Sequence, residues 1–489
     1  MSAPSAFRLR AIPRADLLVA SLLFACSGAL YAMTVCRSVY WYDSAEYATA
    51  AFTLGVPHPP GYPVYTLVAH AFVRMLPCSP ALAVNALSAV AAVLALLLCY
   101  ADARELGCHP PAAATSAVLL ATAPSFWFNA TVAEVYTPGL CVTLCALWLL
   151  LRAQRLRMPR LAVLAAGLCG LGMGVHYSPA TLGLGYASLA AQSAPVAPPT
   201  RRARGVANVF AGCAAAALVG FSVHLVLLLF RANVDVQPNQ AYPLGAARFL
   251  WLITGGNYRL WFVNGSDFLQ RSFELGVLLV RESSGPGALL ALVGIVRLMR
   301  RAPHRGTALL LAMIGNLAFF FRYRVHDLEV FLLPTVALLA VSAGLGTQSV
   351  VESIAPRLRS AYAARSLSLV LLAIPCARVF TDFSGRNLGE FHEAHDYGER
   401  LSAQLPYNAV ILNYTTPDEW KYDAVFGLYF QQVLGRRRDV TVTKSAERTV
   451  VDQLLAERRP VFLYAPVAQV DREYSVTRQG DLYRVGARR

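Results

Sequence analysis

Residues 81–101 read ALAVNALSAVAAVLALLLCYA, a run without any charged side chain. A transmembrane helix needs about 17–25 predominantly apolar residues to cross a hydrocarbon core of about 30 Å. The whole chain agrees with this run: of its 489 residues 56% are hydrophobic and 15% charged, and its mean hydropathy is +0.47. Soluble globular domains have a more polar balance. The sequence therefore predicts a polytopic α-helical membrane protein.

Similar apolar runs recur up to about residue 380, although several are shorter than a comfortable span. We expect eleven transmembrane helices, near residues 17–35, 81–101, 111–128, 137–151, 161–175, 177–190, 207–230, 287–299, 306–321, 330–346 and 366–380. After residue 380 the sequence is polar and has no run of span length. The chain is thus expected to divide into a transmembrane domain at 1–380 and a soluble domain at 381–489.

The soluble domain has the pattern of an α/β module. Residues 409–412 and 461–464 are apolar runs of strand length, and residues 450–457 have the periodicity of an amphipathic helix. The long segment at 231–286 also has amphipathic stretches, which we expect to lie along the membrane surface. There it would either cover a groove for a lipid tail or support the soluble domain.

The basic residues predict how the chain is oriented. They fall in alternate connections, at Arg8, Arg10, Arg14, Arg104, residues 152–160, residues 201–204, Arg297, Arg300, Arg301, Arg305, Arg357, Arg359 and Arg365. The positive-inside rule places these connections and the N-terminus in the cytoplasm, and the soluble domain on the extracytoplasmic side. Residues 161–190 must then cross twice, with a turn at 174–179. The first run follows arginines as a signal peptide does, but because many spans come after it we expect it to be retained. We expect an integral protein of the bacterial inner membrane.

The net charge of +15, from 43 basic and 28 acidic residues, does not indicate nucleic acid. The arginines form short clusters between apolar runs, without the interleaved aromatic residues that stack on bases. The ten cysteines have neither CxxC pairs nor Cys/His metal spacing. The sequence therefore predicts neither a zinc site nor a disulfide framework.

The first outer connection carries the residues that suggest chemistry. It reads YWYDSAE at 40–46 and LGVPHPPGYP at 54–63. Asp43 and Glu46 are three residues apart, so a helix that begins here presents both on one face. In isolation this pattern would be a helix cap. A carboxylate beside an apolar span and three aromatic side chains is also partly desolvated, which suits a general base. His58 lies in a Pro/Gly segment whose backbone is held.

These motifs resemble the protein O-mannosyltransferase family related to transmembrane protein 260, a branch of the GT-C glycosyltransferase superfamily. The resemblance begins with the 43–63 segment and continues in VNALSA at 84–89, AEVYT at 133–137, DLEVFLLP at 327–334 and the stretch from LPYNAVIL at 405–412 to RDV at 438–440. It implies a GT-C-like fold and transfer of a sugar, possibly mannose, from a polyprenyl-phosphate carrier. The acceptor would be a hydroxyl of a protein, a glycan or a lipid on the non-cytoplasmic side.

The resemblance also implies roles for single residues. Asp43 would be the catalytic carboxylate that takes the acceptor's proton, and Glu46 would orient it or the acceptor. His58 and Tyr62 would help to bind substrate, and Glu134 and Tyr136 would meet them from the second outer loop. If attack is direct, the anomeric carbon is inverted.

The departing lipid phosphate needs fixed donors at membrane-surface depth. Arg322 and Arg324, close before Asp327, are the candidates, although interfacial arginines also commonly snorkel to lipid headgroups. Asp327 and Glu329 must lie at the outer mouth of the bundle, because a charge at mid-membrane costs about 2.5–3.5 kcal/mol. There they would either cap the next helix or line the site. The outer carboxylates could hold a divalent cation, but no ligand spacing requires one.

Two other classes of protein fit part of this pattern. A transporter or lipid flippase also has many spans and outer carboxylates, but it should show charged or broken helices at mid-membrane or paired repeats. A noncatalytic scaffold would leave the carboxylate and His-Pro-Pro-Gly cluster without a purpose. We therefore expect an enzyme, a glycosyltransferase of GT-C type.

Overall fold

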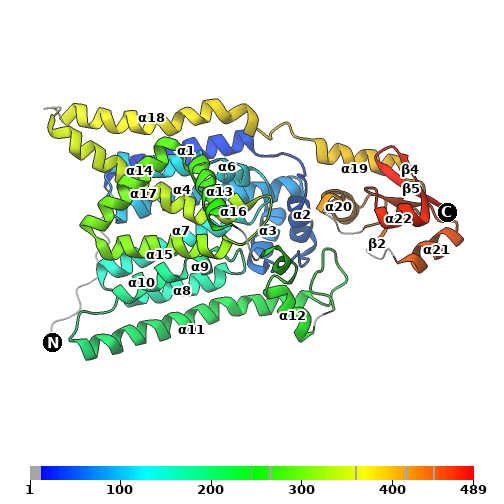
Figure 1. Ribbon diagram of the computed structural model, residues 1–489, viewed down its shortest axis with the longest axis horizontal. Helices are drawn as coiled ribbons and strands as arrows, with labels where there is room; N and C mark the ends of the chain where they lie inside the picture. Colours follow the sequence, from blue (N-terminus) through cyan, green and yellow to red (C-terminus); the bar gives the residue numbers. More distant parts are fainter. Residues whose placement is uncertain (1–12, 244, 264–266, 358–360, 414–416, 444–446) are drawn as a thin grey trace.

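The computed structural model describes residues 13–243, 245–263, 267–357, 361–413, 417–443 and 447–489. A bundle of long helices forms most of the molecule, and a smaller module with a β-sheet is attached to one end of it (Figure 1). Short helices α2 and α3 lie at the end of the bundle that faces the module. Arg8, Arg10 and Arg359, which belong to the predicted cytoplasmic connections, lie outside the described residues.

The helices of the bundle have the following bounds. They are α1 (Arg14–Thr34), α2 (Asp43–Thr53), α3 (Pro63–Met75), α4 (Pro80–Glu105), α5 (Pro110–Ala121), α6 (Pro124–Thr131), α7 (Tyr136–Leu156), α8 (Pro159–Gly172), α9 (Ser178–Thr181), α10 (Gly183–Gln192), α11 (Pro199–Arg231), α12 (Ala246–Ile253), η1 (Gly256–Trp261), α13 (Phe268–Ser283), α14 (Gly285–Arg301), α15 (Pro303–Phe320), α16 (Leu328–Phe331), α17 (Leu333–Ile354), η2 (Ala355–Arg357) and α18 (Ala361–Arg386).

Six helices among the described residues are long and apolar enough to cross a membrane, namely α1, α4, α7, α11, α17 and most of α18. A seventh span results if α13 and α14, which meet at a bend of 102°, are taken together. The other predicted spans correspond to shorter or interrupted helices: 111–128 is divided into α5 and α6, 161–175 is α8, 177–190 is α9 and α10, and 306–321 is α15. Membrane character is thus shown, and the count of eleven stays a prediction.

Proline marks where many of these helices begin. Helices α4, α5, α6, α8, α11 and α15 each have proline in the first turn, where no N–H is needed. The predicted span at 111–128 is interrupted for this reason: Pro124 starts α6, and the residue before it is extended. The break between α13 and α14 falls at Ser284, whose φ of 60° no helix continues.

The arginine-rich connections lie together at one end of the bundle. Arg104 of α4 pairs with Asp16 of α1 at 2.6 Å, and Arg155 of α7 pairs with Glu105 of α4 at 3.0 Å. Arg297 of α14 pairs with Glu352 of α17 at 2.7 Å. These ion pairs join the ends of five helices, and α2 and α3 lie at the opposite end (Figure 1). The bundle therefore has one basic end and one end that carries the candidate site.

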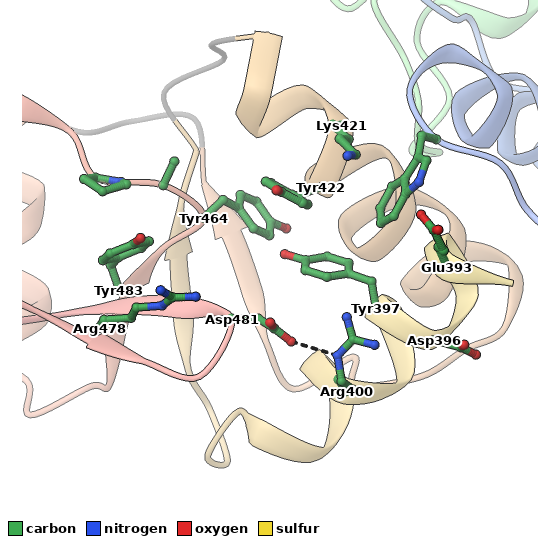
Figure 2. A pocket seen from close by; sticks show the side chains of 13 residues that line it. Glu393, Asp396, Tyr397, Arg400, Lys421, Tyr422, Tyr464, Arg478, Asp481 and Tyr483 are labelled. Carbon is green, nitrogen blue, oxygen red and sulfur yellow. Dashed lines mark hydrogen bonds and ion pairs between the residues drawn. The ribbon is translucent and has the colours of Figure 1, made fainter.

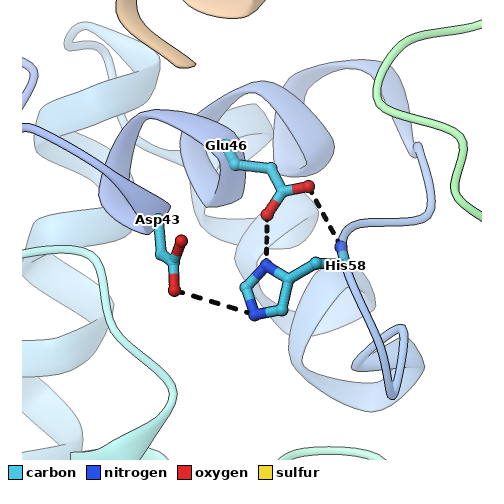
Figure 3. A group of neighbouring side chains, drawn as sticks. All are labelled: Asp43, Glu46 and His58. Carbon is cyan, nitrogen blue, oxygen red and sulfur yellow. Dashed lines mark hydrogen bonds and ion pairs between the residues drawn. The ribbon is translucent and has the colours of Figure 1, made fainter. Parts of the chain in front are cut away.

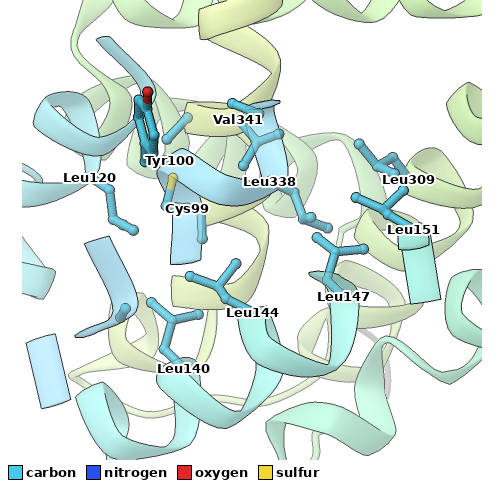
Figure 4. Packing of buried hydrophobic residues seen from close by; sticks show 14 of the residues in the cluster. Cys99, Tyr100, Leu120, Leu140, Leu144, Leu147, Leu151, Leu309, Leu338 and Val341 are labelled. Atoms are coloured by element: carbon cyan, nitrogen blue, oxygen red, sulfur yellow. The ribbon is translucent and has the colours of Figure 1, made fainter. Parts of the chain in front are cut away.

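The bundle core is apolar and closely packed. Leu140, Leu144, Leu147 and Leu151 repeat at helical spacing along α7 and point toward α4, α15 and α17 (Figure 4). The backbones of helices α14 and α17 are in close contact. A side chain at Gly294 would collide with the carbonyl oxygen of Ser342, so only glycine fits there. Small residues let helix backbones come this near in membranes, where dispersion contacts drive association.

The module contains a five-stranded sheet with the strand order β2-β1-β3-β5-β4. Strands β2, β1 and β3 are parallel, and β5 and β4 join as antiparallel strands. The predicted strands near 409–412 and 461–464 are β1 and β3, and the predicted amphipathic helix is α21. The elements are α19 (Glu393–Gln404), β1 (Val410–Leu412), α20 (Pro417–Asp423), η3 (Ala424–Val433), β2 (Thr441–Thr443), α21 (Arg448–Ala456), β3 (Val461–Leu463), α22 (Ala468–Glu473), β4 (Tyr474–Gln479) and β5 (Leu482–Arg488).

The module is joined to the bundle by a shared apolar core. Ala45 and Ala48 of α2 belong to the same buried cluster as Phe426 of η3 and Ile411 of β1. Helix α2 packs directly against η3. The first outer connection is therefore held between the transmembrane bundle and the module.

Candidate active site

Helix α2 begins at Asp43 and brings three titratable side chains together (Figure 3). The Nε2 atom of His58 lies 3.7 Å from Oδ2 of Asp43, and its Nδ1 is hydrogen-bonded to Oε2 of Glu46. The backbone N–H of His58 donates a second hydrogen bond of 3.0 Å to Oε1 of Glu46. Both oxygens of Glu46 are therefore used to hold the histidine. The sequence predicted that Asp43 and Glu46 share a helix face, and here they share a partner.

The structure does not have the helix cap that the isolated pattern would suggest. Tyr42 is the N-cap of α2, with a φ of 56°, and no side chain caps the helix. The Asp43 carboxylate instead points toward His58, and Glu46 is fully buried beneath it. The two carboxylates thus belong to a side-chain cluster.

Aromatic side chains surround His58. The Tyr47 hydroxyl lies 3.3 Å from Nε2, and the rings of Tyr62 and Tyr258 contact the imidazole edge to face, with centroids 5.2 and 6.1 Å away. Tyr47 stands four residues after Asp43 and so lies on the same face of α2. The side chain of His58 is only 12% exposed. His58 is therefore shielded from bulk water, whereas the Asp43 side chain is 36% exposed and remains accessible.

These surroundings determine which group carries a proton. Burial alone would lower the pKa of His58, but the charges of Asp43 and Glu46 and the hydrogen bond to Glu46 outweigh it and raise the pKa to about 9. At neutral pH the imidazole is consequently a cation between two carboxylates. A protonated histidine cannot act as a base, and Glu46 is already engaged. Asp43 is left as the group that can accept a proton.

A tryptophan of the soluble module reaches this cluster. Nε1 of Trp420, on α20, donates a hydrogen bond of 2.9 Å to Oδ1 of Asp43. Sequence reasoning missed Trp420, since no local pattern links it to the first outer loop. Tyr258 of η1 was also missed. Tyr47 could have been found from its helical spacing to Asp43.

Two residues of the VNALSA motif at 84–89 hold the loops after α1 and before α7 in place. The amide of Asn85 donates to the carbonyl oxygens of Cys36 and Ser38, at 2.7 and 3.2 Å. Ser88 exchanges hydrogen bonds of 3.2 Å with the backbone of Glu134. Helix α4 thus fixes the first and second outer connections relative to each other, which explains why polar residues occur in this apolar helix.

Glu134 and Tyr136 lie beside the cluster, as predicted. Burial, together with the charges of Asp43 and Asp327, raises the pKa of Glu134 well above its ordinary range. A protonated carboxyl can donate a hydrogen bond but cannot accept a proton. Glu134 is therefore better suited to donate a hydrogen bond to a substrate oxygen than to act as a base. The ring of Tyr136 contacts His176 and Phe331, with centroids 5.1 and 5.5 Å away. His176 lies in the predicted turn between α8 and α9, so that turn is at this end of the bundle.

Arg322 and Arg324 flank Tyr323, which is close enough to Asp43 for the charge of Asp43 to affect it. The segment 322–324 pairs with 261–263, through Val263 N–H to the Arg322 carbonyl at 3.1 Å and Arg324 N–H to the Trp261 carbonyl at 2.9 Å. Burial raises the pKa of Tyr323, between the two arginines, and the charges of Asp327 and Asp43 add to the effect. The guanidinium of Arg324 is bound to Glu274 at 3.1 Å.

Asp327 and Glu329 lie at the start of α16, immediately before the long helix α17. Asp327 precedes α16 without capping it through its side chain. Burial raises the pKa of Asp327, with a contribution from Asp43. Glu329 instead pairs with Arg281 at 3.4 Å. Of the two roles considered, Asp327 fits the lining of the site better than a cap.

The same three side chains could hold a divalent cation. Asp43, Glu46 and His58 each offer a ligand atom, and these atoms lie within 4.8 Å of one another. Carboxylate and imidazole donors suit Mn²⁺ or Zn²⁺. A cation bound between Nε2 of His58 and Asp43 would leave the hydrogen bond from Nδ1 to Glu46 in place, as is usual for a metal-ligating histidine. Only a proton on Nε2 would compete with such a cation.

Known proteins resemble the part of the chain that contains this cluster. Residues 43–186 match the family described as the Protein O-mannosyl-transferase TMEM260 N-terminal domain. The Protein O-mannosyl-transferase TMEM260 of Mus musculus is 35% identical over 162 residues, which are 31% of this chain and 22% of the mouse protein. The chain thus spans about a fifth of that relative's length. The match begins at Asp43 and includes every predicted site residue up to Tyr136.

Solved structures with the same fold cover nearly the whole chain. ArnT from Cupriavidus metallidurans, bound to undecaprenyl phosphate, has a TM-score of 0.62 at 13% identity over 96% of both chains. The oligosaccharyltransferase of Archaeoglobus fulgidus has a TM-score of 0.57 at 14% identity over 92% of this chain and 69% of that one. The predicted resemblance is therefore confirmed: residues 43–186 match the TMEM260 N-terminal domain, and the chain has the fold of the GT-C glycosyltransferases.

Proposed function

We propose that this protein is a membrane glycosyltransferase that moves a sugar from a polyprenyl-phosphate carrier to an acceptor hydroxyl. The observation that carries the proposal is the cluster of Asp43, Glu46 and His58, where Glu46 is buried against His58 and Asp43 is the more accessible carboxylate. The family match that starts at Asp43 and the likeness to ArnT with undecaprenyl phosphate support the class of donor. Mannose is the first sugar to test, because the matched family is described as O-mannosyl-transferase.

In the proposed reaction the acceptor oxygen attacks the anomeric carbon while Asp43 takes the hydroxyl proton. The bond between the anomeric carbon and the phosphate oxygen breaks, and its electron pair leaves with the polyprenyl phosphate. A direct displacement of this kind inverts the anomeric carbon. His58 and Glu46 are positioning residues that hold the Asp43 carboxylate in place, and Glu134 and Tyr136 bind substrate.

The leaving phosphate is proposed to meet Arg322 and Arg324 at the membrane surface. Their segment is fixed by its pairing with 261–263, and the neighbouring Tyr323 is within the electrostatic reach of Asp43. Tyr62 and Asp327 complete the proposed donor site. Developing negative charge on a phosphate is stabilised by such fixed donors.

We further propose that the site lies on the extracytoplasmic side of a bacterial inner membrane. The basic end of the bundle, opposite the site, would face the cytoplasm under the positive-inside rule. Residues 1–380 would then form the transmembrane catalytic domain, and residues 381–489 an extracytoplasmic domain.

Sugar transfer in membranes tests the proposal directly. Membranes that contain the wild type should transfer radiolabelled mannose from polyprenyl-phosphate mannose, and Asp43→Asn should reduce the rate about 10²- to 10⁴-fold. Asp16→Asn is the matched control, because Asp16 pairs with Arg104 at the opposite end of the bundle. Equal transfer by Asp43→Asn and the wild type would remove Asp43 as the base. No transfer from any polyprenyl-phosphate sugar would favour a transporter instead.

A further inference from the structure

A second cavity lies in the soluble module, next to the candidate active site. Its volume is about 570 Å³, within the range of about 300–1,000 Å³ that is usual for small-molecule sites. Helix α19, α20, the end of β3 and the β4–β5 hairpin form its walls, and Trp41 of the first outer connection closes one side. Neither the family match at 43–186 nor the proposed chemistry at Asp43 accounts for this cavity.

Aromatic rings form one wall of the cavity. The Tyr397 and Tyr422 rings are tilted by 32° with centroids 4.8 Å apart, and Tyr464 stacks on Tyr422 at 6.2 Å (Figure 2). The Tyr397 side chain is only 5% exposed, and its hydroxyl has no hydrogen-bond partner among the residues that the structure describes. A buried hydroxyl without a partner costs about 1–3 kcal/mol.

The remaining walls carry charges of both signs in balance. Glu393, Asp396 and Asp481 are matched by Arg400, Lys421 and Arg478. Asp481 accepts a hydrogen bond of 3.0 Å from Arg400 across the cavity wall (Figure 2). Such a site offers many donors and many acceptors but no net charge. It therefore suits a neutral ligand with several hydroxyl groups rather than a phosphate or a nucleic acid.

The cavity adjoins the candidate active site through two short connections. Trp41, which lines it, precedes Asp43 by two residues, and Lys421 directly follows Trp420, the hydrogen-bond partner of Asp43. The ammonium of Lys421 also lies 4.6 Å above the Trp41 ring. Two short stretches of chain, 41–43 and 420–421, therefore link the cavity to Asp43.

We propose that this cavity binds a neutral saccharide, which is the acceptor for the transfer at Asp43. Binding of a saccharide stands by itself, whereas its role as the acceptor rests on the proposed function, since an acceptor needs a donor. Aromatic faces would pack against the sugar ring, and the paired charges would bond to its hydroxyl groups. The enzyme would then extend a glycan rather than modify a bare polypeptide side chain.

The β4–β5 hairpin offers a matched pair of variants. Arg478 is paired with Tyr483 in the sheet and Thr477 with Arg484. Arg478 and Tyr483 line the cavity, whereas Arg484 is not among its lining residues and pairs with Phe462 of β3. Arg478→Ala should therefore remove a cavity group, and Arg484→Ala removes the same charge from a nearby position that does not line the cavity.

Saturation-transfer difference NMR on the full-length protein in nanodiscs measures binding without any transfer. The probes are the methyl glycosides of mannose, glucose, galactose and N-acetylglucosamine, and a serine- and threonine-rich hexapeptide. At least one glycoside should bind, with affinity reduced about tenfold by Arg478→Ala but unchanged by Arg484→Ala. Absence of binding by all glycosides, equal effects of the two arginine variants, or binding of the peptide alone would overturn the inference.

The two proposals fail in distinguishable ways. Transfer to the peptide without glycoside binding would remove the saccharide site and leave the proposed function in place. Glycoside binding without transfer from any polyprenyl-phosphate sugar would keep the site and remove the proposed function. Bound glycosides should also become labelled products in the transfer assay, and a bound glycoside that is never labelled would overturn its role as acceptor.

Discussion

The indole of Trp420 donates a hydrogen bond of 2.9 Å to Oδ1 of Asp43, although 377 residues separate the two in sequence. Trp420 belongs to the soluble module, and Asp43 begins the first helix after the opening span. The module therefore contributes a contact to the carboxylate that we propose as the base. If Asp43 is the base, the module is part of the proposed active site.

Replacing Trp420 by phenylalanine should lower kcat about tenfold or more and leave KM for the lipid-linked donor unchanged. The ring stays in place, but the hydrogen bond to a charged acceptor, which contributes about 1.5–3 kcal/mol, is lost. Trp148→Phe is a suitable control, because Trp148 lies at the basic end beside Arg152. The measurement is the steady-state rate of transfer at varied donor concentration. A higher KM at constant kcat would show that Trp420 contributes to binding only.

His58 should give the enzyme an alkaline limit. Its pKa is raised from 6.5 to about 9, because the charges of Asp43 and Glu46 outweigh burial. The stabilisation that this ion pair gives the folded protein is fully present below pH 6.5. It is lost as the pH rises through about 9, where the folded protein releases the proton. The stabilisation by this ion pair, about 3 kcal/mol, disappears over that interval.

Transfer rates measured from pH 6 to pH 10 test this assignment. The wild type should lose activity as the pH passes about 9, and His58→Gln should have a lower rate that no longer depends on pH in this region. Both should keep their activity in EDTA if a proton, rather than a metal ion, is bound between the carboxylates. Loss of activity in EDTA with recovery in Mn²⁺ would show that His58 is a metal ligand instead.

The two glutamates that pair with cations at the outer end should differ strongly in their contribution to stability. Glu46 is fully buried, and Glu46→Ala would leave the buried His58 without its main partner, which should cost about 3–5 kcal/mol of unfolding free energy. Glu329 is 27% exposed and pairs with a largely exposed Arg281, so Glu329→Ala should cost about 0–1 kcal/mol. Unfolding in detergent micelles measures both. Similar losses would mean that the Glu46–His58 pair is not the main support of this segment.

The sequence was most informative where the chemistry is local. Asp43, Glu46 and His58 lie within one connection, and helical spacing predicted that the two carboxylates share a face. That His58 reaches both of them was not predicted, because its position depends on how the Pro/Gly segment turns back on the helix. The Trp420 contact depends on how the module folds back on the bundle, and no pattern of spacing records that. The cavity at Tyr397 is formed by four separate elements and was missed for the same reason.

Among the spans, hydropathy located the apolar runs better than it located their breaks. The sequence SSGPG at 283–287 contains the turn residues that end α13, yet the apolar run after it was read as a span by itself. Pro124 similarly divides a run that is apolar throughout. Apolar composition measures whether a segment can lie in a membrane, whereas helix continuity depends on backbone groups that hydropathy does not describe.

Two cysteine positions can test the orientation of the chain. Cys78 is exposed in the connection between α3 and α4, at the end of the bundle with the candidate site, and Ala203 is exposed within the arginine cluster at the other end. In intact spheroplasts a membrane-impermeant maleimide should therefore label the wild type, and Cys78→Ser should abolish this labelling. In a Cys78→Ser background, Ala203→Cys should react only after the membrane is permeabilised. The reverse pattern would place Asp43 in the cytoplasm, where the proposed extracytoplasmic acceptor could not reach it.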